Sequence, residues 1–192
     1  MLKSTVPLTI IDVCPITGPA AYGRKKFVDV LNGLGCQIAI VRDIDHARSQ
    51  KRIFIGLTDD PSIRKVLKHT SSAPEGVIIR NISSQNTLVI SGTDERGLMF
   101  ALLEISQHLE AEGITGLDTV EDIEEFPVNR VRGVDRYIMG HLDNAWFFSE
   151  SFWQYFLSRL AENRFNRFVL IMIDSLLSGT KRVPSQRKAR QP

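Results

Sequence analysis

The chain has 192 residues, of which 43% are hydrophobic and 24% charged, and its formal net charge is +2. These values are typical of a folded globular protein with one domain or slightly more, and they exclude a fibrous or wholly disordered chain. Five of the 24 Lys and Arg residues lie between residues 175 and 192, which hold no acidic residue. The rest of the chain is therefore mildly acidic, and we expect no nucleic-acid binding.

No apolar run reaches the roughly 20 residues that a membrane helix needs. The apolar segment Pro7–Cys14 is too short for the core of a signal peptide. We therefore expect a soluble protein with no signal peptide and no membrane partner. The two cysteines, Cys14 and Cys36, and the four histidines lack the spacing of metal ligands. The sequence predicts buried free thiols, no metal site and no cofactor.

The chain up to Glu112 alternates β-branched runs with segments of helical period. Strands are predicted at Leu8–Val13, Cys36–Ile44, Arg52–Leu57, Gly76–Ile82 and Asn86–Ser91, the last two joined as a hairpin. Helices are predicted at Ala20–Leu34, from Asp60 onward, and from Gly92 through Glu112. This order predicts an α/β sandwich, in which helices cover a sheet that is at least partly antiparallel.

The glycines at the start of the third helix, Gly92 and Gly97, have two interpretations. A glycine-rich turn between a strand and a helix suggests a phosphate cradle, but the third glycine and the lysine of such motifs are missing. The sequence therefore favours a tight turn that needs glycine for steric reasons.

The second half of the chain begins with an acidic segment, residues 114–127, which predicts a solvated connector. Beyond it, Arg130–Ile138 predicts a strand, and residues 149–163 predict an amphipathic helix with Ser149 as its N-cap. Arg167–Asp174 contains the unbroken apolar run FVLIMI, which is typical of a parallel strand buried on both faces. The composition of residues 175–192 predicts a basic, disordered tail.

Three segments together resemble a known group of enzymes. They are GTDERGLMFALLEISQHL after two strands, then FPVNRVRG, and finally NRFNRFVLIMID after a helix. They look like the small α/β domain and the start of the (β/α)8 barrel in glycoside hydrolases, among them the β-N-acetylhexosaminidases and the α-glucuronidases. The resemblance implies an α/β accessory domain over residues 5–125, the first βαβ unit of a TIM barrel over 128–174, and carbohydrate as the partner.

One departure bears on the family. Hexosaminidases usually carry His-x-His in the second barrel strand, where this chain has Val169-Leu170-Ile171. The difference favours a related barrel hydrolase.

The resemblance also implies two substrate-binding residues. Arg132 matches the arginine of the family's Arg-Gly pair, which contacts sugar hydroxyls, and a guanidinium suits this task because its planar fork of donors can hold two oxygens. A surface or interdomain ion pair is the alternative role for Arg132. Asp174 matches the acid at the end of the second barrel strand, where binding groups collect in such barrels.

Four polar and aromatic residues, His141, Asp143, Asn144 and Trp146, follow the first predicted barrel strand on the face where such enzymes bind substrate. Trp146 is suited to stack on a sugar ring, and Asp143 or Asn144 to hold hydroxyls. The alternative, which we favour, is that Trp146 packs under the following helix while Asp143 and Asn144 make hydrogen bonds within the turn.

Glycoside hydrolysis needs a carboxylic acid and a second carboxylate or a substrate amide, and in hexosaminidase-like barrels this pair comes from the fourth strand. This chain reaches the second strand, whereas a whole barrel takes about 250 residues. We therefore expect a glycoside hydrolase fragment that has no catalytic residue and is inactive by itself, and that self-associates through the exposed edge at Phe168–Ile173. A non-enzymatic α/β interaction module and a nucleic-acid binder that uses the basic tail are the alternatives.

Overall fold

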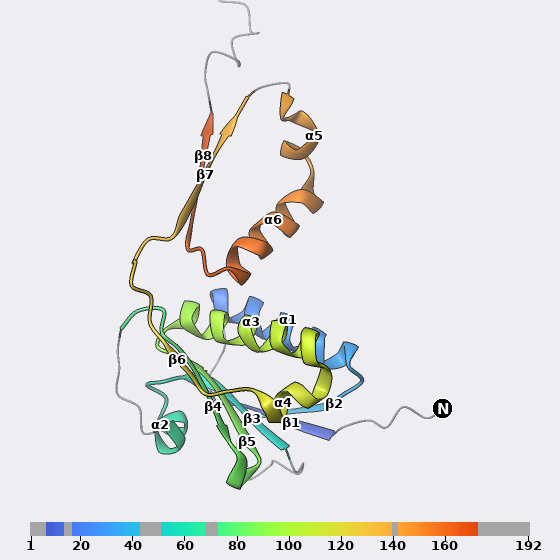
Figure 1. The fold of residues 1–192 in the computed structure, drawn as a ribbon, viewed down its shortest axis with the longest axis vertical. Helices are drawn as coiled ribbons and strands as arrows, with labels where there is room; N and C mark the ends of the chain where they lie inside the picture. Colours follow the sequence, from blue (N-terminus) through green and yellow to red (C-terminus); the bar gives the residue numbers. More distant parts are fainter. Residues whose placement is uncertain (1–6, 14–16, 43–50, 68–72, 140–141, 173–192) are drawn as a thin grey trace, which may run out of the picture. The chain divides into compact units, whose positions relative to one another are not determined.

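The computed structural model describes residues 7–13, 17–42, 51–67, 73–139 and 142–172 (Figure 1). The chain divides by compactness into two units, residues 1–130 and residues 131–192. The first unit contains one six-stranded sheet, and the second contains a two-stranded sheet.

The six-stranded sheet has the order β2-β1-β3-β5-β4-β6. Four neighbouring strands, β2, β1, β3 and β5, are parallel, while β4 runs antiparallel to both β5 and β6. The mixed sheet confirms the α/β fold class expected from the sequence. The strands are β1 (Pro7–Asp12), β2 (Gln37–Val41), β3 (Lys51–Leu57), β4 (Val77–Ile82), β5 (Thr87–Gly92) and β6 (Ile123–Glu125).

Helices cover both faces of this sheet (Figure 1). The two long helices, α1 and α3, lie side by side on one face, and a β carbon at Gly23 of α1 would lie 3.0 Å from the Cα atom of Met99 in α3. The short helix α2 covers part of the other face, where Ile63 packs against Ile11 and Phe54. The helical segments are α1 (Gly18–Gly33), α2 (Pro61–Leu67), η2 (Ser83–Gln85), α3 (Glu95–Glu112), η3 (Gly113–Thr115) and α4 (Gly116–Thr119).

The junction between β5 and α3 explains the two glycines that the sequence places there. A β carbon at Gly92 would lie 1.9 Å from the backbone nitrogen of Leu98, and one at Gly97 would lie 2.3 Å from the carbonyl oxygen of Gly76. Both positions thus need glycine because backbone segments approach each other closely. Asp94 is the N-cap of α3, and its carboxylate accepts hydrogen bonds from the backbone N–H groups of Gly97 at 2.8 Å and Glu75 at 2.9 Å.

We expect Asp94→Ala to lower the free energy of unfolding of the first unit by about 2–3 kcal/mol, because it removes a helix cap and leaves a second N–H without its acceptor. Asp94→Asn keeps one carbonyl acceptor and should cost about half as much. Urea unfolding followed by circular dichroism measures both values. A stability for Asp94→Ala within about 0.5 kcal/mol of the wild type would show that the junction does not depend on this carboxylate.

The acidic side chains of the segment predicted as a solvated connector are exposed, as expected, but the segment forms regular structure and is not a simple connector. Residues 113–119 form η3 and α4, and Ile123–Glu125 adds β6 to the edge of the sheet. Arg80 of β4 donates to the carbonyl oxygen of Ile123 at 3.1 Å and forms an ion pair with Glu124. Acidic side chains of this segment therefore neutralise the charge of Arg80 on the neighbouring strand. A three-residue edge strand with two exposed glutamates carries no apolar alternation, so its sequence pattern does not differ from that of a loop.

The second unit is a β–α–β arrangement (Figure 1). Its strands are parallel, and residues Gly133 to Ile138 pair in register with Arg167 to Met172. Ser149 caps the main helix as predicted, accepting a hydrogen bond from the backbone N–H of Phe152 at 3.2 Å. The elements are β7 (Gly133–Ile138), α5 (Asn144–Phe147), α6 (Glu150–Glu162) and β8 (Arg167–Met172), and α5 lies between the predicted strand and the predicted helix.

Strand β8 is not buried on both faces, contrary to the prediction. Its residues from Phe168 to Ile171 are half-buried. The ring of Phe168 packs on the side of α6, with centroids 5.8 Å from that of Trp153 and 5.5 Å from that of Phe156. Within the described part of this unit, α6 covers one face of the strand pair and no element covers the other, which accounts for the partial burial.

Candidate functional site

The candidate site lies at the carboxyl-terminal ends of β7 and β8. Because the two strands are parallel and in register, both end at the same edge of their sheet, which is the edge where (β/α)8 enzymes bind substrates. Asp143, Asn144 and Trp146 belong to the connection that leaves β7 after Ile138. The structure thus brings these three predicted residues together on one connection at this edge.

Asp143 closes the connection back onto the end of the strand. Its carboxylate accepts hydrogen bonds from the backbone N–H of Met139 and, at 2.7 Å, from the indole N–H of Trp146. The hydrogen bond from Met139, the one from Trp146 and the nearby charge of Arg136 all hold the pKa of this carboxyl below its ordinary value. Asp143 is therefore ionised at neutral pH, and both donors that order it come from its own connection.

Trp146 is half-buried in a group of aromatic rings that also orders the helix. Its ring centroid lies 5.2 Å from that of Phe152 and 5.6 Å from that of Trp153, both of α6. On the strand side, the guanidinium carbon of Arg136 lies 4.1 Å from the centroid of the Trp146 ring. The indole thus has the packing contacts considered for Trp146 from the sequence, and its stacking on a sugar ring stays a prediction.

Asn144 is the first residue of α5 and is exposed. Its carbonyl oxygen accepts a hydrogen bond from the backbone N–H of Phe148 at 3.4 Å. The exposed side-chain amide offers both a donor and an acceptor to a ligand at this edge.

Arg132 lies at the opposite end of the strand. It immediately precedes β7, and its Nε–H donates to the carbonyl oxygen of Arg164 at 2.7 Å, in the turn before β8. Its backbone also bonds to Asn166, as donor to Oδ1 at 2.9 Å and as acceptor from the N–H at 3.0 Å. Six strand residues at about 3.3 Å each separate this end from the carboxyl edge by about 20 Å. Arg132 thus holds the amino-terminal ends of the two strands together, and its predicted sugar contact stays a prediction.

Three of the residues considered from the sequence, Cys14, His141 and Asp174, lie outside the described residues. Cys36 is a half-buried free thiol, whose pKa is raised by desolvation. Among the residues that the structure describes, no three His, Cys, Asp or Glu side chains gather as metal ligands would. No helix in the same ranges is both long and apolar enough to cross a membrane.

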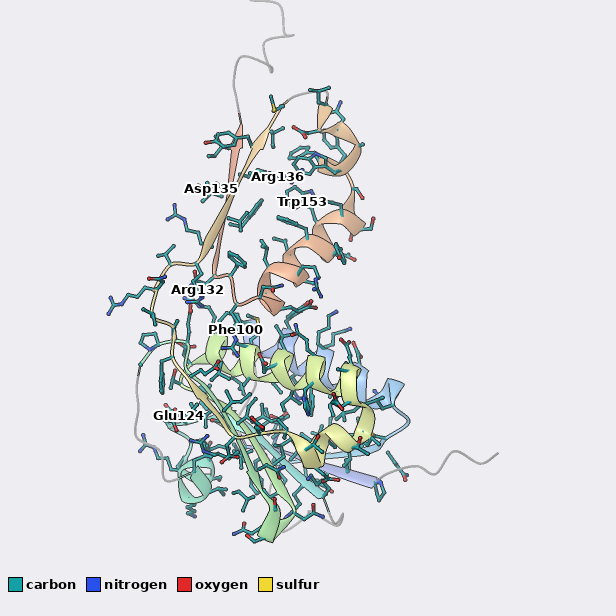
Figure 2. The ribbon with its side chains drawn as sticks, in the orientation of Figure 1. Phe100, Glu124, Arg132, Asp135, Arg136 and Trp153 are labelled. Carbon is teal, nitrogen blue, oxygen red and sulfur yellow. The ribbon has the colours of Figure 1, made fainter. Side chains whose placement is uncertain are left out.

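Arg136 is the residue that sequence reasoning missed. It lies between Val134 and Ile138 on the face of β7 that packs on α6, and Figure 2 shows it between the strand and the helix. A signal was present, because a charged residue at a half-buried strand position next to an aromatic-rich helix is unusual. Hydrophobic periodicity identifies arginine only as a polar surface residue, so it does not reveal a cation–π contact.

We expect the second unit to lose stability in acid through Asp143. The pKa of Asp143 is lower in the folded chain than in the unfolded chain. Its contribution is therefore fully present above the unfolded value, about 4, and is lost as pH falls through the folded-state value. Both tryptophans of the chain, Trp146 and Trp153, lie in this unit, so urea unfolding followed by tryptophan fluorescence at pH 5 and pH 2.5 reports on it alone.

In Asp143→Asn the loss of stability between the two pH values should be smaller than in the wild type. Asp135→Asn, which changes an exposed carboxylate on β7, is the matched control and should keep the wild-type dependence. An unchanged pH dependence in Asp143→Asn would mean that the carboxylate does not order the connection.

Comparison with known proteins finds likeness at the level of structure. No family model and no curated protein matches the chain. A solved GH138 enzyme targeting pectin rhamnogalacturonan II is similar with a TM-score of 0.65 at 17% identity, covering 86% of this chain and 24% of that one. The structure of CpGH84D is similar with a TM-score of 0.61 at 11% identity, covering 88% of this chain and 28% of that one. The chain thus has a fold found in glycoside hydrolases and spans about a quarter of the length of each of these two structures.

Proposed function

We propose that the chain is an accessory α/β domain and the first βαβ unit of the barrel of a carbohydrate-active glycoside hydrolase, of the β-N-acetylhexosaminidase-like type. The observation that carries the proposal is the order of its two units, a six-stranded α/β sheet followed by a parallel β–α–β arrangement. Two glycoside hydrolases resemble this chain over most of its length. Because a fold by itself does not assign chemistry, the polar groups at the carboxyl edge supply the second support.

We propose that sugar hydroxyls bind at this edge, on the connection that follows β7. The carboxylate of Asp143 is a fixed acceptor, and the exposed amide of Asn144 is a donor and an acceptor. Asp174, which the resemblance implies as a substrate-binding residue, would add a second carboxylate. Trp146 would support the edge from beneath.

The same chemistry leads us to propose that the chain by itself does not hydrolyse glycosides. A general acid must be protonated near neutral pH. The pKa of Asp143 is lowered, so this carboxyl is ionised and unsuited to the task. No second carboxylate lies beside Asp143 in the described part of the connection. The acid pair would come from later strands of a longer protein.

A turnover assay tests this proposal. The full chain, incubated with 4-nitrophenyl N-acetyl-β-glucosaminide and the matching β-galactosaminide, should release no nitrophenol above the buffer rate. A glycan array should show weak signals confined to N-acetylhexosamine-terminated glycans. Turnover above the buffer rate would contradict the proposal that the chain by itself is inactive, and array signals on unrelated glycans would contradict the sugar class.

A non-enzymatic interaction module remains a second candidate because of one observation. Apolar side chains on and beside β7 are exposed, among them Val131 at 60% and Tyr137 at 57%. Such a surface favours association with a second copy through the strand pair. Sedimentation velocity over a hundredfold concentration range tests this, and a monomer at every concentration would exclude it.

A further inference from the structure

The strongest unexplained group in the described residues is the side chain of Arg136. It is half-buried, its Nε atom is buried, and that atom has no hydrogen-bond partner. Placing a charged group beneath a helix costs free energy, and an apolar side chain of similar length would fill the space without that cost. Packing alone therefore does not account for an arginine at this position.

The contacts of Arg136 indicate what it does. Its guanidinium carbon lies 4.1 Å from the centroid of the Trp146 ring and 5.9 Å from that of Phe152. A guanidinium attracts the face of an aromatic ring and fixes the plane of that ring. The edge of the same indole carries the N–H that donates to Asp143 at 2.7 Å. The orientation of one ring thus links the cation on the strand to the carboxylate in the connection.

Asp143 links the orientation of the indole to the backbone of the connection through hydrogen bonds. Its second oxygen accepts from the N–H of Met139, the residue that follows the last residue of β7. Its carbonyl oxygen accepts from the N–H groups of Trp146 at 3.2 Å and Phe147 at 2.9 Å, which fixes the first turn of α5. Asn144 lies in that turn. Asp143 therefore holds the connection at two places, at Met139 and at the turn that contains Asn144.

We infer that Arg136 is a positioning residue of the substrate-binding edge, which orients Trp146 so that the indole binds Asp143 and the connection presents Asn144 to the ligand. This inference rests on the proposed function for the identity of the ligand, a carbohydrate, but the positioning itself can be measured without one. Arg136 touches no ligand in this account and acts through Trp146.

The test uses the full chain labelled with 15N, whose two indole N–H groups give separate signals. In Arg136→Gln, the indole proton of Trp146 should move upfield as its hydrogen bond weakens, while that of Trp153, which donates to the carbonyl oxygen of Phe147, should stay in place. Exchange of the Met139 amide should become about tenfold faster. The heteronuclear NOE of the Asn144 amide should fall.

Three further variants separate positioning from general damage. Arg136→Lys keeps the charge over the ring but loses the planar stacking, and should give intermediate values. Trp146→Phe removes the indole donor and should release Met139 and Asn144 with Arg136 intact. Arg159→Gln makes the same charge change at an exposed position of α6, where the arginine pairs with Glu162, and should leave all three signals unchanged.

The inference is overturned if Arg136→Gln leaves the Trp146 indole and the Met139 amide as in the wild type. If Arg136→Gln does not fold, wild-type signals in Arg136→Lys and Trp146→Phe would overturn it equally. Titration with N-acetylglucosamine is read separately. If Arg136→Gln releases Asn144 but the wild type binds no sugar, the positioning stands and the sugar class of the proposed function fails.

Discussion

Gly92→Ala should unfold the first unit, with a loss of about 3 kcal/mol or more in the free energy of unfolding. The added methyl carbon would lie 1.9 Å from the backbone nitrogen of Leu98 and 2.4 Å from the carbonyl carbon of Gly97. Backbone atoms at the start of a helix cannot move aside as a flexible side chain can. Relief would require α3 to shift away from the end of β5, and α3 contributes much of the buried core of this unit.

The matched control for Gly92→Ala is Gly33→Ala, at the end of α1. A β carbon there meets no atom within 4 Å, and alanine is the better helix former. This variant should be as stable as the wild type or more stable by up to about 1 kcal/mol. Circular dichroism and amide exchange of β1, β3 and β5 measure both variants. Wild-type protection of these strands in Gly92→Ala would contradict the close approach at the junction.

Trp153→Ala should have the corresponding effect on the second unit. The Trp153 ring lies against the rings of Trp146, Phe147, Phe152, Phe156 and Phe168, with centroid distances between 5.4 and 6.3 Å. Its indole N–H donates to the carbonyl oxygen of Phe147 at 2.7 Å. Removing the ring should cost about 3 kcal/mol, which is most of the stability that a unit of this size holds.

Fluorescence of the remaining Trp146 follows the unfolding of Trp153→Ala. Tyr155→Ala, on the same helix with a side chain 68% exposed, is the control and should stay within about 0.5 kcal/mol of the wild type. A midpoint for Trp153→Ala equal to that of Tyr155→Ala would mean that the aromatic rings do not form the core of this unit.

The fold was predictable from the sequence where apolar periodicity was strong. The parallel core strands and the long helix α3 carry clear patterns, and Asn86–Ser91 lies within one residue of the observed β5. The edge strand β6 was missed because charge pairing with Arg80, rather than apolar burial, holds it in the sheet. Such pairing is a tertiary property, which a local pattern does not contain.

The candidate site was predictable only in part. Asp143, Asn144 and Trp146 could be identified as candidate binding residues because they follow a predicted barrel strand. The role of Arg136 depends on its position over an aromatic ring ten residues later, which the sequence does not fix. The resemblance implies a sugar contact for Arg132, which stays a prediction. The observed contacts of Arg132 lie at the amino-terminal ends of β7 and β8 and could not be predicted from the sequence, because they depend on how the two strands pair.

The most direct test of the central claim is the sequence of the transcript across and beyond codon 174, where the predicted second barrel strand, Arg167–Asp174, ends. The claim is that this chain carries an accessory domain and the first βαβ unit of a glycoside hydrolase barrel. If it is correct, a longer transcript or the adjoining genomic frame should encode further strand–helix repeats, with two carboxylates at the end of a later strand. A locus that encodes no further repeats in any frame would contradict the account.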